Sequence, residues 1–460
     1  MPSHQTNTLL RVLDEKGGAL PSILFLVTIL STAAASVILL HFLNAQLTQR
    51  EIGMVKADYA SQSGIATMLS RVHSLPDVAE ATGETTLSFE DGSRAIVSSR
   101  RWGLFSLINA EGRFRKTSTR RLALTAERLS KQFVNALMFT NADHQLVIAG
   151  TTSIKGDIVT GALGISTGTL KDRVTPRSLP IDGNVKKDRS ITSFKINRTQ
   201  LLDQVRDFDG LLGNNAMTGI AEDATLRLVS DGKLVLSRAT IRDSITIVLV
   251  KGNVALGGPL SRRDQPLTIV VDGVLSFQND CQLRGLIRIV SSKEMRIPAN
   301  ILIDTPIIYS QKGIVVENSA EITAQLFADS IVVKSKSTLR YPSVVATLSG
   351  PGNKTVQIET GAHIEGTVLS FSGNDQRTPG LVTIHPGAEV TGLVYAEDRL
   401  TLDGSVRGIV IAKDFYFYEA PTTYLGWIRS GTIDRSRLPN SFLLPLGVSS
   451  SPQYEVLDWL

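Results

Sequence analysis

The fold of this 460-residue chain is decided by one nine-residue stretch, Gly361-Ala362-His363-Ile364-Glu365-Gly366-Thr367-Val368-Leu369. The stretch recurs at 387–395, a shortened form follows at 404–411, and an early relative occupies 153–159. A second element, consisting of a strand, a polar turn and another strand, recurs at steps of 21, 20, 19 and 17 residues around Val254, Leu275, Met295, Ile314 and Ile331. Short strands with glycine corners at such a period indicate a β-solenoid.

The spacing of the copies is irregular, which favours a loosely built right-handed parallel β-helix over residues 141–438. Each coil buries its alternate Val, Ile and Leu side chains only by stacking on its neighbours. A β-sandwich is the alternative, because strands at regular 8–12-residue spacing also fit that fold. A C-terminal tail follows at 439–460.

Solenoid ends must be covered, because an open coil exposes unpaired strand edges. The helical pattern at 201–212 is one candidate cover, and the aromatic cluster at 415–427 is predicted to form a C-terminal hydrophobic lid. Alternatively, the cluster forms a platform that binds a surface polysaccharide. The candidate residues of this platform are Tyr416, Tyr418, Tyr424 and Trp427.

Residues 76–140 are predicted to form a small α+β adapter. A hairpin pattern surrounds the turn at Asp91-Gly92, and apolar residues at helical spacing predict a helix over 123–137. Between Arg94 and Lys131 there are ten Lys or Arg residues and two acids, so this segment carries +8 of a chain whose net charge is +5. We interpret it first as a solvated face balanced by acidic neighbours.

The alternative interpretation of the basic segment is a patch for an anionic partner. Its candidate residues are Arg94, Arg100, Arg101, Arg113, Arg115, Lys116, Arg120 and Arg121. No recognised nucleic-acid motif accompanies them, so a nucleic acid is not the expected partner.

The N-terminal region predicts a membrane anchor. The 25 residues from Ala19 to Leu43 carry no charged side chain apart from the ionisable His41, and about 20 apolar residues suffice to cross a bilayer. The helix pattern then continues, becomes amphipathic and predicts one helix from Pro21 to Val72, within a segment at 18–75 that serves as transmembrane span and stalk. The alternative is a signal peptide cleaved after Ala35.

The motif at the start of this region is Lys16-Gly17-Gly18-Ala19-Leu20, and a second motif is Ala60-Ser61-Gln62-Ser63-Gly64-Ile65. With the apolar run between them, they resemble the N-terminus of PilX-type minor pilins and of type II secretion pseudopilins. The resemblance covers about 60 residues. It implies a leader at 1–17 and cleavage by a prepilin peptidase after Gly17 or Gly18.

Major pilins of these families carry a glutamate five residues after the cut, where this chain has Ser22 or Ile23. The resemblance therefore implies a tip or accessory role, and its expected partners are the membrane and other pilins or pilus and secretion assembly proteins. The expected location is the bacterial inner membrane, crossed once, with the body outside the cytoplasm or associated with a filament.

No catalytic or metal site and no cofactor is expected. The acids are scattered singly through the repeats, and no P-loop, dinucleotide fingerprint, nucleophile elbow or zinc motif is present. His363, Glu365, His385 and Glu389 are interpreted as exposed turn residues, and a metal site formed by the four is the alternative. Cys281 is the only cysteine, which excludes an intramolecular disulfide.

Three functions follow as hypotheses. The first is a pilin-like accessory protein that acts by assembly or adhesion, without catalysis. The second is an envelope-tethered β-helix enzyme acting on polysaccharide, which aligned acids and bases on one solenoid face would favour. The third is a polymerising scaffold, because the stacked glycine-containing coils resemble the repeats of bactofilins.

Overall fold

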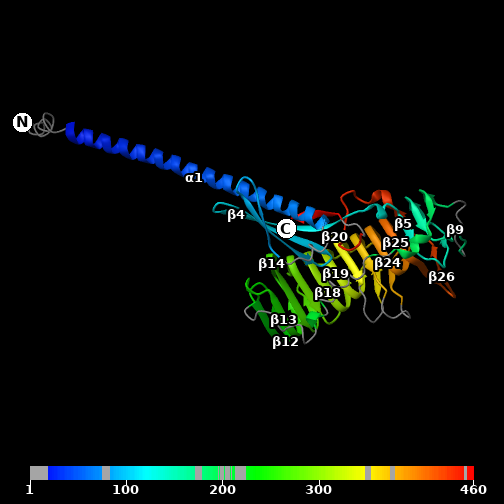
Figure 1. The fold of residues 1–460 in the computed structure, drawn as a ribbon. Coiled ribbons are helices and arrows are strands. Elements are labelled where there is room, and N and C mark those ends of the chain that lie inside the picture. The colour runs from blue at the N-terminus through cyan, green and yellow to red at the C-terminus, as the bar shows by residue number, and fades with distance from the viewer. Residues whose placement is uncertain are drawn as a thin grey trace, which may run out of the picture. The chain divides into compact units, whose positions relative to one another are not determined.

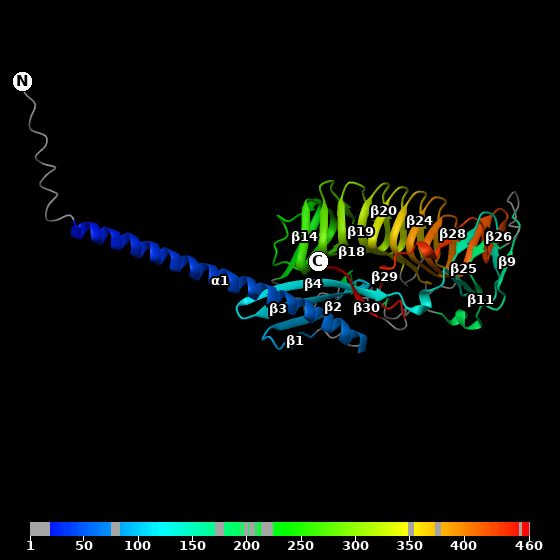
Figure 2. The same cartoon turned by 90° about the horizontal axis from the view of Figure 1, so that it is seen from above.

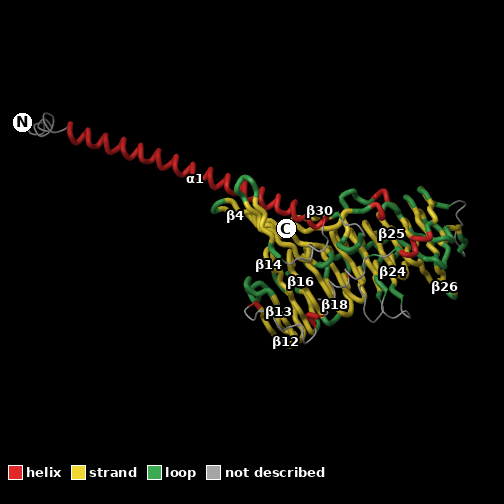
Figure 3. The backbone as a smooth tube through the Cα atoms, viewed as in Figure 1, coloured by secondary structure: helices red, strands yellow, loops and turns green. Residues whose placement is uncertain are grey.

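The computed structural model describes residues 19–74, 83–170, 179–194, 196, 201, 208, 210–212, 224–347, 354–372, 379–449 and 453–459. Strands dominate this part of the chain, and one long helix stands at its N-terminal end (Figure 3). The prediction of a mainly β protein with a long N-terminal helix is confirmed. The chain divides into two compact units, 1–68 with 84–98 and 109–121, and 69–83 with 99–108 and 122–460.

Helix α1 (Ala19–Ser74) is unbroken, as the pattern from Pro21 to Val72 predicted. Its side chains are exposed from residue 20 to residue 52, and burial begins at Gly53. In the exposed part the hydroxyls of Thr28, Thr32 and Ser36 donate to backbone carbonyls one turn earlier, at 2.7 to 2.9 Å. These bonds satisfy the polar hydroxyls locally, so the surface of this half of the helix is apolar.

A sheet of antiparallel hairpins begins in the first unit. Its order is β1-β2-β3-β4-β29, with β30 also paired to β4. The strands are β1 (Thr85–Ser88), β2 (Arg94–Trp102), β3 (Phe105–Phe114), β4 (Thr117–Arg128), β29 (Leu443–Leu444) and β30 (Tyr454–Trp459). Strands β2, β3 and β4 continue from the first unit into the second, so the predicted adapter contributes strands to both.

The second unit contains a parallel β-helix with three faces, which we name A, B and C. Face A holds β7 (Ser153–Lys155), β10 (Ile181–Asp182), β28 (Thr432–Asp434) and the first segments of β14 (Pro259–Asp272), β16 (Gln282–Ser291), β18 (Leu302–Val316), β19 (Glu321–Val333), β20 (Thr338–Thr347), β22 (His363–Ser370), β24 (Glu389–Leu402) and β25 (Ser405–Glu419).

Face B holds β5 (Leu137–Phe139), β8 (Ile158–Thr160), β11 (Val185–Lys187), the start of β12 (Thr225–Leu236) and β13 (Ile247–Leu256), and the middle of the long strands. Face C holds β15 (Leu275–Phe277), β17 (Met295–Ile297), β21 (Thr355–Ile358), β23 (Leu381–Ile384) and the remaining segments. A separate three-stranded sheet contains β6 (Leu146–Ile148), β9 (Ile165–Thr167) and β27 (Trp427–Ile428).

The remaining short elements are β26 (Thr422–Leu425) and the 3-10 turns Lys131–Phe133, Arg189–Ser193 and Arg435–Arg437.

The predicted repeat is confirmed by the strand registers. Val254 pairs with Leu275, and Ile314 pairs with both Met295 and Ile331. The copies of the nine-residue stretch lie directly above one another, so that Gly366, Gly392 and Gly408 are in register. The inward side chains form one continuous apolar core along the stack.

The order of the coils in space differs from their order in the chain. Strand β28 pairs with β7, and β25 pairs with β5, so residues 137–187 stack onto the coil formed by 405–434 (Figure 2). The coil that begins with β12 is at the other end of the described stack (Figure 1). The aromatic cluster at 415–427 therefore lies where two groups of coils join, and the predicted C-terminal lid is wrong.

Face B is apolar on both sides. Its outward residues, including Val290, Tyr309, Phe327 and Leu369, form a second core that the sequence reasoning did not anticipate. Segments 99–108, 122–128 and 438–448 of the same unit cover this core, as do Leu201 and Phe208; most of the predicted helical pattern at 201–212 lies outside the described residues.

The helix predicted over 123–137 is wrong. Strand β4 continues to Arg128, where it pairs with β29 and β30, and only one 3-10 turn follows, at Lys131–Phe133. Leu122, Ala123, Leu124, Thr125 and Ala126 are all buried, so this run is covered on both sides of the sheet. A strand of that kind is as continuously apolar as a buried helix, and the two are not separated by periodicity alone.

Glu127 ends this apolar run and is predicted to make folding pH-dependent. Its side chain is buried, and its two carboxylate oxygens accept hydrogen bonds from the backbone N–H groups of Gly447 (2.5 Å) and Ser449 (2.8 Å). Burial raises the pKa of Glu127 to about 7, against the opposing effect of these hydrogen bonds. The folded state thus favours the neutral carboxyl more strongly than the unfolded state does.

The stability that the neutral Glu127 carboxyl gives to the folded state is therefore fully present below the unfolded pKa of 4.5. It is lost as the pH rises to about 7. We expect Glu127→Gln to gain stability relative to the wild type by roughly 3 kcal/mol across this window. Urea unfolding of both full-length proteins in detergent, measured at several pH values, checks the change in their difference. A difference that does not vary with pH would contradict the prediction.

Candidate functional site

The first half of α1 is the largest apolar surface of the described chain. Between residues 20 and 43, its Leu, Ile, Val and Phe side chains point outward on all sides of the helix. Within the described residues, α1 is long and apolar enough to cross a membrane, and none of its most apolar part is buried. Gly17 and Gly18, the predicted processing residues, lie outside the described residues.

The second half of α1 packs on the first unit's sheet through small residues. Ala57, Ala60, Ser61 and Gly64 are buried on one side of the helix. A side chain added at Gly112 of β3 would overlap the backbone of Ala57 and Ser61, and one added at Gly64 would meet Ala95 and Val97 within 3 Å. Helix and sheet thus approach closely at Ala57 and at Ser61 and Gly64, the last two of which belong to the second N-terminal motif.

An ion pair between α1 and β4 joins the helix to the sheet within this unit. Arg121 of β4 donates two hydrogen bonds to Asp58 of α1, at 2.6 and 2.8 Å. The hydrogen bond from Arg121 holds the pKa of Asp58 below its usual value, and Gln62 contributes in the same direction. Asp58 was not identified from the sequence, although it is the one acid between Gly53 and Ser63 on the helix.

The structure separates the residues of the predicted basic patch. Arg121 faces α1, whereas Arg120 donates to Asn109 (2.6 Å) and Arg113 pairs with Glu111 (2.7 Å). Arg94 is exposed at the start of β2, and Arg115 and Lys116 form the exposed β3–β4 turn. Arg100 and Arg101 belong to the second unit. Six of the eight residues lie in the first unit, where Arg120 and Arg121 have different partners.

The aromatic candidates are also divided. Strands β25 and β26 form a hairpin in which Phe417 stacks on Tyr424, with ring centroids 4.6 Å apart, and Trp427 packs edge-on against Tyr424 at 5.3 Å. Tyr424 and Trp427 thus belong to a small core. Tyr416 lies under the Arg399 guanidinium, and Tyr418 is exposed. The four residues do not make a single flat platform.

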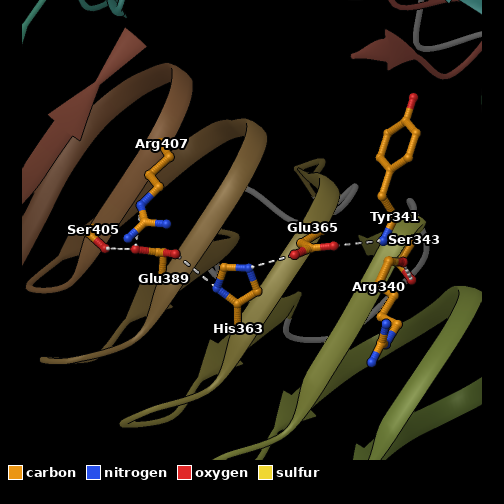
Figure 4. Close-up of polar contacts among 8 residues, drawn as sticks. All are labelled: Arg340, Tyr341, Ser343, His363, Glu365, Glu389, Ser405 and Arg407. Carbon is orange, nitrogen blue, oxygen red and sulfur yellow. Dashed lines mark hydrogen bonds and ion pairs between the residues drawn. The ribbon is translucent and has the colours of Figure 1, made fainter. Parts of the chain in front are cut away.

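Face A carries a ladder of polar side chains across successive coils (Figure 4). His363, Glu389 and Ser405 occupy the same position in three coils. His363 Nδ1 lies 3.0 Å from Glu389 Oε1, and Nε2 lies 3.3 Å from Glu365 Oε1. The ladder continues through Arg407, whose Nε is 2.8 Å from Glu389 Oε2.

The charged side chains at the other end of the ladder also have polar partners. The second oxygen of Glu365 accepts from the Tyr341 backbone N–H at 3.4 Å, while Arg340 pairs with Glu321. The carboxylates of Glu365 and Glu389 lie on opposite sides of the His363 ring (Figure 4). They therefore do not converge on one point where a metal ion could bind both. No group of three metal-ligating side chains suited to an ion occurs among the described residues. The arrangement neutralises charge along the coils.

Comparisons with known proteins add little to this geometry. No protein-family model and no curated protein matches the chain. Among solved structures, the crystal structure of the competence-associated pilin ComZ from Thermus thermophilus is 10% identical, with a TM-score of 0.19, covering 89% of this chain and 97% of the other. At that TM-score the match supports no inference about fold or function.

Proposed function

We propose that this chain is a membrane-anchored, pilin-like accessory protein that displays a β-helix outside the cytoplasm and acts by assembly or adhesion, without catalysis. The observation that carries the proposal is the continuous helix α1, whose first half is apolar on all sides and whose second half packs by small residues on a sheet. The Lys16-Gly17-Gly18 motif and the absence of a glutamate at Ser22 or Ile23 support the accessory role.

In this proposal the apolar half of α1 is the membrane anchor. Substituting charged residues into this half of the helix tests that role. An arginine at the centre of a spanning helix costs about 2.5 to 3.5 kcal/mol. We expect the wild type and the control Leu26→Phe/Leu30→Phe to remain in membranes after carbonate extraction, and Leu26→Arg/Leu30→Arg to be released or degraded. Extraction of all three proteins into the soluble fraction would overturn the anchor.

A second candidate function has one observation in its favour. The ladder in Figure 4 aligns acids and bases on one face of the β-helix, which is the pattern expected of a polysaccharide-acting enzyme. Glu365→Gln/Glu389→Gln would abolish the release of reducing ends from envelope polysaccharide if the face is catalytic. The proposal of a non-catalytic protein expects no release by the wild type. The bactofilin-like scaffold remains a prediction.

A further inference from the structure

The two hairpin turns beside α1 in the first unit carry opposite charges. The β1–β2 turn contains Glu90 and Asp91, and Asp91 lies 3.6 Å from Lys56 of α1. The β3–β4 turn consists of Arg115 and Lys116, both exposed. Figure 2 shows β1, β2, β3 and β4 beside the C-terminal half of the helix. This end of the sheet is therefore electrically polarised, with its positive side at the β3–β4 turn.

The positive turn departs from ordinary turn chemistry. Arg115 has a φ of +53°, and two-residue hairpin turns normally place glycine or asparagine at such a position. The left-handed conformation is unfavourable for a residue with a side chain. Arg115 lies 5.4 Å from the Phe114 ring centroid, but neither it nor Lys116 makes an ion pair with any described residue. No described acidic side chain of the unit neutralises these two charges.

The turn also lies close to the end of the apolar helix surface. Thr117 and Phe114 lie beside Gly53 of α1, within 4 Å of the position that a Cβ would take there, and Gly53 is ten residues after Leu43. At 1.5 Å per residue, this places the turn about 15 Å from the end of the apolar run. The headgroup layer occupies about 5 to 8 Å of that distance, and the Debye length at physiological salt is about 8 Å.

We propose that the β3–β4 turn is a docking element for anionic lipid headgroups, and that it tilts the first unit so that this turn approaches the bilayer while the acidic β1–β2 turn faces away. Arg115 and Lys116 supply the attraction, and Phe114 and Lys56 hold the turn beside α1 through a contact of 4.6 Å between Nζ and the ring centroid. The inference rests on the proposed function, because it requires α1 to be the anchor.

The test compares two positions at the same end of the sheet. Full-length protein is placed in nanodiscs with nitroxide-labelled headgroups, and a fluorophore is attached at Ser118→Cys beside the basic turn or at Ser88→Cys beside the acidic turn. Both sites are exposed, and the native Cys281 is buried. Quenching is expected to be stronger at 118 than at 88 in discs containing phosphatidylglycerol, and equal in phosphatidylcholine alone.

The decisive variant is Arg115→Gly/Lys116→Asn, which suits the turn and removes its charge. It is expected to lower the docked population about tenfold and to equalise the two signals. Salt of about 1 M should do the same, because the Debye length falls to about 3 Å. Lys233→Asn/Lys251→Asn, at exposed lysines of the second unit, makes the same change in net charge and should leave the difference intact.

Equal quenching at 118 and 88 in anionic discs would overturn the inference, and so would a quenching difference that survives the double variant. Loss of the difference when duplex DNA is added at equal phosphate concentration would also overturn it, because the turn would then be a nucleic-acid contact. A label at Leu30→Cys with an acyl-chain nitroxide separates the two proposals. If that label is quenched while 118 and 88 stay equal, the anchor stands and headgroup docking is wrong. If it is not quenched, the anchor itself fails.

Discussion

Replacing Gly392 by alanine is expected to destabilise the β-helix by roughly 3 kcal/mol. Gly392 has a φ of +148°, a conformation that side chains rarely adopt. A Cβ at this position would overlap the carbonyl oxygen of Gly366 in the preceding coil, and Gly366 and Gly408 have the same relation to their own neighbours. The obstacle is backbone and not the end of a flexible side chain, so relief requires the coils to move apart.

Urea unfolding of the full-length protein in detergent, followed by far-UV circular dichroism, measures this loss. The matched control is Gly313→Ala, in strand β18 of the same β-helix, whose added Cβ would come no closer than 3.3 Å to any neighbouring atom. We expect the control to change the free energy of unfolding by less than about 1 kcal/mol. Equal effects of the two substitutions would show that close coil stacking does not require Gly392.

The second large effect is expected at Gln325. Its side chain is 4% exposed within the second core and bridges the β2–β3 turn: Oε1 accepts from the Leu104 N–H at 2.7 Å, and Nε2 donates to the Trp102 carbonyl at 3.0 Å. Gln325→Leu would leave two buried backbone groups without partners. At about 1–3 kcal/mol each, the expected loss of stability is about 2–6 kcal/mol.

The same change at an exposed strand position isolates this effect. Gln357 on face C is exposed, and Gln357→Leu should alter the free energy of unfolding by no more than about 0.5 kcal/mol. Both variants are measured by urea unfolding in detergent. If Gln325→Leu is as stable as Gln357→Leu, the amide does not hold the β2–β3 turn on face B.

The coils could be predicted because glycine corners and inward aliphatic residues recur at measurable steps. Their order in space could not, since the copy at 153–159 carries the same signal wherever it stacks. The second core left a trace in the sequence: Val248–Val250 and Ile269–Val271 are continuously apolar, which is typical of strands buried on both faces. The alternation of apolar and polar residues marks only strands with a single buried face.

The side-chain sites were less accessible from the sequence. The basic segment could be recognised from its composition, but its arginines alternate between the two faces of a sheet. Which face each arginine occupies can be assigned only when the strand boundaries are known. Arg121 therefore pairs with Asp58 of the helix, whereas Arg120 contacts Asn109. Tyr424 and Trp427 were likewise grouped with Tyr416 and Tyr418 by proximity in the chain, although the hairpin packs the first two inward.

The measurement that tests the central claim most directly is the mature N-terminus of the protein in the membrane fraction, determined by mass spectrometry with and without the prepilin peptidase. Membership of the pilin pathway predicts a chain that begins at Gly18 or Ala19 only when the peptidase is present. An unprocessed Met1 end in both strains would contradict it, and a start at Ser36 would mean that the apolar half of α1 is a signal peptide and no anchor.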